Sequence, residues 1–189
     1  ATAMTRLSNA LLSRSTGRLA LLALVIFLAF TALVLPRQAA QAEQYSAAGS
    51  PDTSFFYTAT DLYTWAEAYG PDGRSAYVRA RLTFDVLWPL VYTFFLVTAL
   101  SWLMPRAFPS QTIWTRANLI PLLAMLFDFL ENGAAALVMA RYPQQTPIVA
   151  SLAGPLTSLK WLFVYASFAL LLLGILIAAW RRLLPGTSR

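Results

Sequence analysis

Four long apolar runs divide the chain, and polar or charged residues bound each of them. They cover approximately residues 19–36, 84–105, 117–140 and 160–180. A helix needs about 20 apolar residues to cross the hydrocarbon core of a bilayer, so each run is long enough to cross once. The pattern predicts an all-α, polytopic membrane protein, in which a four-transmembrane-helix bundle forms a single membrane domain over residues 1–189.

The first run permits a second interpretation. Arg14 and Arg18 precede it, and Ala40-Gln41-Ala42 follows it, an arrangement that also occurs in cleavable signal peptides. Because the apolar stretch is longer than the usual core of a signal peptide, we interpret it as a retained transmembrane helix.

The distribution of cations predicts the orientation. With the N-terminus inside, the inner segments hold eight of the 14 Lys and Arg residues and no acid, and the outer segments hold the other six. Since Lys and Arg favour the cytoplasmic side, we predict a multi-pass protein of the cell inner membrane with both termini cytoplasmic. The inner cations are Arg6, Arg14, Arg18, Arg106, Arg116, Arg181, Arg182 and Arg189.

Residues 37–83 form the one long segment between apolar runs, and we predict an extracytoplasmic loop with one or two short interfacial helices. Thr60 is a suitable N-cap for a helix over about 61–69, and Pro71 suits the start of a second helix. The aromatic residues of this segment suit the membrane interface. We expect this segment to be a lid that covers helix ends. The alternative is a lid that binds a ligand.

Polar residues inside the third run are the main candidates for a site. Asp128, Glu131 and Asn132 are spaced three and four apart, so they share one helix face. An acid near the centre of a membrane helix costs roughly 2.5–3.5 kcal/mol, which favours a position inside the bundle. We predict a polar intramembrane cluster of Asp128, Glu131, Asn132, Tyr92 and Ser167, with an outer mouth formed by Asp85, Lys160 and Arg81.

Composition excludes several classes of function. The chain is 58% hydrophobic and has a mean hydropathy of +0.59, as membrane proteins do. It has no Cys and no His, so we expect no metal site and no cofactor, and lipid or pigment contact only without ligation by His. The net charge of +6 is spread over the ends of apolar runs, and we therefore predict no nucleic-acid partner.

A set of polar, aromatic and glycine residues recurs together in a known family. These residues are Tyr69-Gly70, Gly73-Arg74, Tyr77, Asp85, Asp128, Glu131-Asn132, Tyr142-Pro143 and Lys160. With them the chain resembles, over about Tyr57 to Trp161, a family of uncharacterised four-helix bacterial integral membrane proteins, and this resemblance implies the topology but no reaction. A fainter likeness is to four-helix isomerases of the emopamil-binding kind, whose His is absent here.

The polar cluster has two interpretations, a latch that fixes helix register or a functional site. Our first hypothesis is an accessory or scaffolding subunit of a larger respiratory or photosynthetic membrane complex, with the lipid bilayer and other membrane subunits as partners. The alternatives are an acid site that binds or transforms a small lipophilic ligand, and proton-linked transport. No catalytic residue is assigned, and enzymatic activity is left open.

Overall fold

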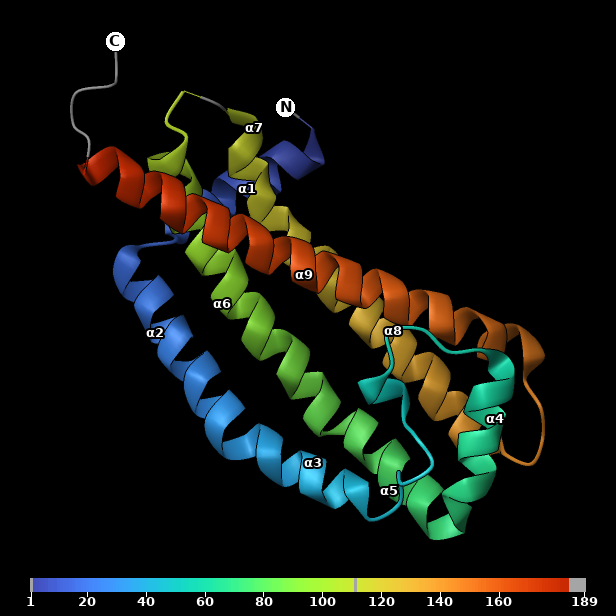
Figure 1. Cartoon of the computed structure of the whole chain (residues 1–189). Coiled ribbons are helices and arrows are strands. Elements are labelled where there is room, and N and C mark those ends of the chain that lie inside the picture. Colours follow the sequence, from blue (N-terminus) through green and yellow to red (C-terminus); the bar gives the residue numbers. More distant parts are fainter. Residues whose placement is uncertain (1, 111, 184–189) are drawn as a thin grey trace. The chain divides into compact units, whose positions relative to one another are not determined.

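The computed structural model describes residues 2–110 and 112–183, and Arg189 lies outside these described residues. All regular structure in this part of the chain is helical (Figure 1). Four helical segments are long and apolar enough to cross a membrane: Gly17–Glu43, Gly70–Ala107, Ile113–Arg141 and Pro147–Leu183. The predicted all-α fold with four membrane-spanning helices is confirmed, and the protein is a membrane protein.

Twelve helical elements follow one another along the described chain. They are α1 (Ala3–Arg14), α2 (Gly17–Ala29), the π-helical turn η1 (Phe30–Val34), α3 (Leu35–Glu43), the short 3-10 turn η2 (Pro51–Thr53), α4 (Ala59–Ala68), α5 (Gly70–Leu82), α6 (Phe84–Ala107), α7 (Thr112–Thr115), the 3-10 turn η3 (Arg116–Leu119), α8 (Ile120–Arg141) and α9 (Pro147–Leu183).

The first membrane segment extends further than its apolar run indicated. Instead of ending at Pro36, the helix continues through α3 to Glu43. A proline inside an α-helix lacks a hydrogen-bond donor and clashes with the preceding turn. Here the wider π-helical turn η1 immediately precedes α3, and Pro36 occupies the first turn of α3, where a proline is tolerated.

The long polar segment is helical, as expected, but its first helix starts earlier. Thr58, not Thr60, is the N-cap of α4, and its hydroxyl accepts a hydrogen bond from the backbone N–H of Asp61. The Asp61 carboxylate in turn accepts from the Thr58 backbone and hydroxyl, which completes a capping box. These hydrogen bonds lower the pKa of Asp61, and the one from the Thr58 backbone has the largest effect.

The chain folds into two compact units, a grouping that the sequence analysis did not predict. Unit 1 comprises residues 1–27, 91–123 and 163–189, and unit 2 comprises residues 28–90 and 124–162. Unit 1 packs around Leu100, Met104 and Ala117, against which Phe108, Leu170 and Leu171 lie.

Helix α1, which the apolar pattern did not indicate, is tied to unit 1 by buried polar groups. The Ser8 hydroxyl donates to Asn118 Oδ1 at 2.9 Å. Asn118 Nδ2 donates to the Ser8 carbonyl at 3.2 Å and to Ser101 Oγ at 3.0 Å. Ser8, Ser101 and Asn118 are all buried, so these hydrogen bonds fix α1 against η3 and α6.

The core of unit 2 joins the polar segment to the membrane helices. Its buried members come from the residues before α4, from α4 and α5, and from α8 and α9, and they are Tyr57, Leu62, Ala66, Tyr69, Tyr77, Ala135, Val138, Met139, Ala150 and Ala153. Two side chains hold the residues before η2: Tyr69 donates to the Gly49 carbonyl at 2.8 Å, and Trp65 donates to the Ala48 carbonyl at 3.1 Å. The segment between η2 and α5 is therefore packed against the unit.

Candidate functional site

The polar face of α8 points into the protein. Asp128, Glu131 and Asn132 are 7%, 0% and 5% exposed, respectively. On other sides of the same helix, Leu126 and Leu130 are about half exposed. The helical spacing thus directs the carboxyl groups inward and leaves leucine for the surroundings.

Glu131 is held by two side chains from outside α8. Lys160 Nζ of α9 lies 3.0 Å from Glu131 Oε2 and 3.8 Å from Asp128 Oδ1. The Tyr57 hydroxyl donates to Glu131 Oε1 at 3.0 Å. Burial raises the pKa of Tyr57 above its ordinary value, and the negative charge of Glu131 raises it further. The phenol therefore keeps its proton and remains a donor.

A close approach of two backbones brings Tyr57 to this depth. Gly154 of α9 faces the backbone of Tyr57, and a Cβ atom at position 154 would lie 1.8 Å from the Tyr57 carbonyl oxygen. Any side chain there would push the segment before α4 away from α9. Gly154 is therefore the residue that permits the Tyr57–Glu131 hydrogen bond.

A second group of contacts centres on Arg81 of α5. Its guanidinium forms ion pairs with Asp52 and with Asp85, the latter at 2.9 Å. The Arg81–Asp85 pair has i, i+4 spacing, although Thr83 interrupts the helix between α5 and α6. The guanidinium also lies over the ring of Tyr77, with its central carbon 4.2 Å from the ring centroid.

Asn132 connects the two groups. Its Oδ1 accepts a hydrogen bond from Arg81 at 3.0 Å, and its Nδ2 donates to Asp128 Oδ1 at 2.9 Å. Polar contacts therefore form a continuous series of side chains that we call the Arg81–Lys160 network: Asp52, Arg81, Asp85, Asn132, Asp128, Lys160, Glu131 and Tyr57.

The network runs from an accessible end to a buried end. The Asp52 side chain is 39% exposed, whereas that of Glu131 is 0% exposed. Burial alone would raise the pKa of Asp52, but the charge and hydrogen bond of Arg81 outweigh this effect and lower it. Asp52 therefore stays ionised at the accessible end of the series.

Two buried donors in this region lack a hydrogen-bond partner among the described residues. They are the Tyr77 hydroxyl and Arg81 Nε. Burial raises the free energy of such groups unless an acceptor satisfies them. In the part of the chain that the structure describes, neither donor has the oxygen acceptor that a buried polar group ordinarily has.

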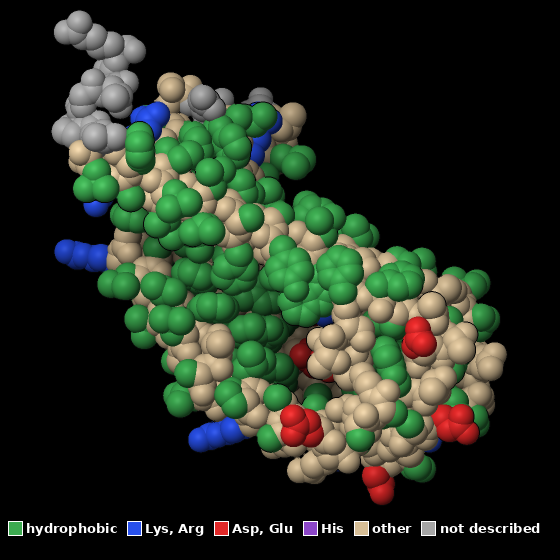
Figure 2. All heavy atoms as spheres, in the orientation of Figure 1, with side chains coloured by type: hydrophobic (Ala, Val, Ile, Leu, Met, Phe, Trp, Pro, Cys, Tyr) green, Lys and Arg blue, Asp and Glu red, His purple; other side chains and the backbone are tan. Residues whose placement is uncertain are grey.

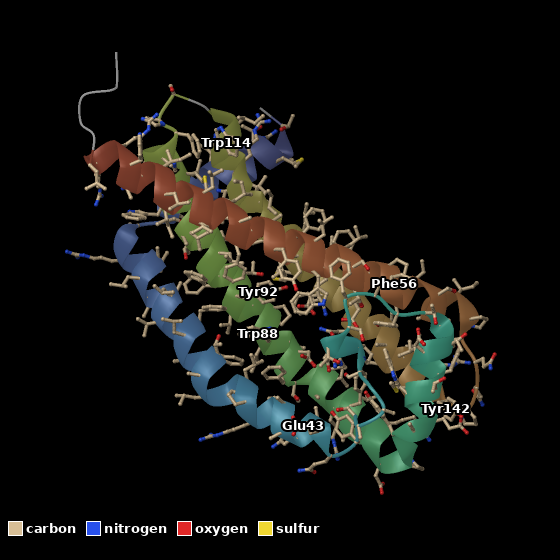
Figure 3. The ribbon with its side chains drawn as sticks, in the orientation of Figure 1. Glu43, Phe56, Trp88, Tyr92, Trp114 and Tyr142 are labelled. Atoms are coloured by element: carbon tan, nitrogen blue, oxygen red, sulfur yellow. The ribbon has the colours of Figure 1, made fainter. Side chains whose placement is uncertain are left out.

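The structure brings six of the eight predicted site residues into the network, all in unit 2. They are Arg81, Asp85, Asp128, Glu131, Asn132 and Lys160. Tyr92 and Ser167 belong to unit 1 and are not placed relative to these six. Ser167 is buried and donates to the Phe163 carbonyl of its own helix at 2.7 Å, and Tyr92, labelled in Figure 3, is buried on α6.

Sequence reasoning missed two members of the network, Asp52 and Tyr57. Both precede α4, where no helical periodicity assigns a side to each residue. The signal in the sequence was the hydroxyl of Tyr57, which the preceding Phe55 and Phe56 lack. In the structure Phe55 and Phe56 are more than half exposed, whereas Tyr57 is 2% exposed. A buried phenol requires a polar partner, and the acids of α8 were the available candidates.

A separate hollow lies on the surface of unit 2. Its volume is about 410 Å³, and Ala59, Thr60, Tyr63, Thr64, Glu67, Tyr142 and Gln145 line it. Figure 3 labels Tyr142 at the end of α8, close to α4. None of the predicted site residues lines this hollow. In the described part of the chain, no group of three or more His, Cys, Asp or Glu side chains is arranged to hold a metal ion.

Comparisons with protein-family models, with curated proteins and with solved structures found no match. The arrangement of the Arg81–Lys160 network therefore carries the functional argument by itself.

Proposed function

We propose that unit 2 contains a proton-linked site, within the membrane, for a small lipophilic ligand. The observation that carries this proposal is the continuous polar series from Asp52, which is partly exposed, to Glu131, which is fully buried. Ionisable groups inside membrane segments are costly, and in general they mark binding sites or proton pathways.

The balance of charge in the buried part of the network supports the proposal that the site is proton-linked. Arg81 and Lys160 supply two cations, whereas Asp85, Asp128 and Glu131 supply three carboxyl groups, and none of these five side chains is more than 13% exposed. One negative charge would remain in excess if all five were ionised. Because an unbalanced buried charge is unfavourable, we expect a proton on at least one of these three carboxyl groups.

The unpartnered donors support the choice of ligand. Tyr77 Oη and Arg81 Nε can donate to an oxygen acceptor, and the surrounding membrane helices are apolar. A small apolar molecule with a carbonyl or hydroxyl oxygen fits this combination. Tyr57 and Glu131 would then be the donor and acceptor of a proton near that ligand, and no reaction is assigned to them.

Infrared spectroscopy of the full chain in lipid nanodiscs tests for the proton. We expect a carbonyl stretch of a buried protonated carboxyl group, whose intensity changes with pH. Asp85→Asn, Asp128→Asn or Glu131→Gln should remove or shift this band. Glu67→Gln, which changes an exposed acid of α4, is the matched control and should leave it unchanged. If none of the three network variants alters the spectrum, the proposal is wrong and the network contains only fixed ion pairs.

A second candidate function is that of an accessory or scaffolding subunit in a larger membrane complex, respiratory or photosynthetic. Its support is the uneven burial of the spans: the apolar windows of the first and last segments are 11% buried, against 61% and 44% for the middle two. Figure 2 shows hydrophobic side chains over α2 and α9, which other membrane helices could cover. Native mass measurement in mild detergent tests this candidate, and a lone monomer or homodimer would count against it.

We further propose that the protein lies in the inner membrane with both termini in the cytoplasm. Support comes from the arginine residues at the ends of the spans that belong to unit 1. Because the chain lacks cysteine, a single introduced thiol reports its own side of the membrane. A membrane-impermeant maleimide applied to intact cells should label Thr64→Cys and not Ser13→Cys, both exposed positions. The reverse pattern would refute this orientation.

A further inference from the structure

The acidic residues are confined to one of the two units. Unit 1 contains eight arginines and no acid, whereas unit 2 contains all eight acids together with six cations. Figure 2 shows acidic side chains over the part of the surface formed by α4 and α5, which belong to unit 2. The cations of unit 1 therefore have no carboxylate of their own unit to neutralise them.

The described arginines of unit 1 are all exposed, and they are Arg6, Arg14, Arg18, Arg106, Arg116, Arg181 and Arg182. Their positions mark the ends of membrane segments: Arg18 lies in the first turn of α2, Arg106 in the last turn of α6, and Arg181 near the end of α9. The segment ends of unit 1 thus place guanidinium groups at the boundary between hydrocarbon and water.

Helix α1 adds an interfacial element to this boundary. The hydrogen bonds of Ser8 with Asn118 hold it against η3, whose first residue is Arg116. Arg116 Nη2 lies 3.5 Å from the Thr5 hydroxyl of α1, and Arg6 is the next residue after Thr5. Arg116 therefore lies beside the start of α1, although the two are far apart in the chain.

The exposed side chains of α1 include apolar and cationic residues. Met4 and Leu7 are 66% and 48% exposed, and Arg6 and Arg14 are exposed as well. A helix of this kind places apolar side chains among acyl chains and its cations among headgroups when it lies in the membrane surface. Asn118 holds α1 near the start of the membrane segment Ile113–Arg141, where headgroups and acyl chains meet if this segment crosses the bilayer.

We propose that α1 and the start of η3 form a binding surface for anionic phospholipid headgroups, in which Arg6, Arg14 and Arg116 contact headgroup phosphates. A guanidinium group binds a phosphate through two parallel hydrogen bonds, which explains why arginine suits this role. The three exposed cations attract an anionic headgroup, and Met4 and Leu7 can contact the acyl chains of the lipid.

Lipid titration of the full chain in mild non-ionic detergent, followed by native mass spectrometry, tests this proposal. The probes are phosphatidylglycerol and phosphatidylcholine of identical acyl chains. We expect the wild-type chain to retain phosphatidylglycerol in preference to phosphatidylcholine. The triple variant Arg6→Gln, Arg14→Gln and Arg116→Gln should bind phosphatidylglycerol about 100-fold more weakly, since each surface cation contributes roughly fivefold.

The control removes the same charge from unit 2, through Arg37→Gln, Arg79→Gln and Arg141→Gln, all exposed arginines. It should retain the lipid preference. If the unit 1 variant does not fold, the wild-type chain still provides a test, because high salt should weaken phosphatidylglycerol binding but not phosphatidylcholine binding. Equal binding of the two lipids, or equal losses in the two triple variants, would overturn the proposal.

Discussion

Replacing Lys160 with Met is expected to lower the free energy of unfolding by about 3–5 kcal/mol, the usual cost of breaking a buried ion pair by removing one partner. Lys160 Nζ lies 3.0 Å from Glu131, whose side chain is 0% exposed. Methionine preserves much of the volume of lysine but leaves the Glu131 carboxylate without its cation. The measurement is denaturant or thermal unfolding of the purified chain in detergent micelles.

Two further variants show whether the stability loss of Lys160→Met comes from the broken ion pair. Arg79→Gln removes an exposed cation of α5 and should change the free energy of unfolding by no more than about 0.5 kcal/mol. The double variant Lys160→Met, Glu131→Gln should recover part of the loss, because glutamine carries no charge and its oxygen can still accept from Tyr57. If Lys160→Met is as stable as the wild type, Glu131 is not ionised opposite Lys160.

Replacing Gly154 with Ala should cost about 3 kcal/mol or more, although alanine is normally the better residue within a helix. The added Cβ would lie 1.8 Å from the Tyr57 carbonyl oxygen, so the backbone before α4 has to move. Overpacking of this kind costs about 1–3 kcal/mol, and the displaced Tyr57 hydroxyl would also lose its hydrogen bond to Glu131. Thermal unfolding in detergent measures the sum of both effects.

Gly133 provides the matched control for this substitution. It lies in α8 of the same unit, and a Cβ there meets nothing within 4 Å. Gly133→Ala should therefore leave stability unchanged or raise it by about 0.5–1 kcal/mol, through the higher helix propensity of alanine. Equal responses at positions 133 and 154 would show that the close approach of Tyr57 to α9 does not occur.

Helical periodicity was sufficient to predict the central part of the network. The spacing of Asp128, Glu131 and Asn132 placed all three on one face, and the cost of exposing acids to lipid turned that face inward. Arg81 and Asp85 were linked by the same i, i+4 rule, even though the helix is interrupted between them at Thr83. Periodicity was reliable here because each of these residues lies on a regular helix.

The remaining contacts depend on segments that have no such periodicity. Tyr57 and Asp52 reach the network from η2 and the residues after it. The depth of Tyr57 depends on a close approach at Gly154 that no local pattern encodes. Helix α1 was missed for a related reason: its apolar residues form no run long enough for a membrane signal, and its position depends on Asn118, which is distant in sequence. The helix that contains the first span continues past Pro36, and a π-helical turn directly precedes this stretch.

The amide of Asn132 has a fixed direction. Its oxygen meets the positive guanidinium of Arg81, and its nitrogen meets the carboxyl group of Asp128. Rotating the amide by half a turn would set like polarities against each other on both sides. Aspartate has the same shape but would present an acceptor to Asp128, and leucine has a similar shape with neither function. Position 132 therefore selects a carboxamide by chemistry, since shape alone does not distinguish the three side chains.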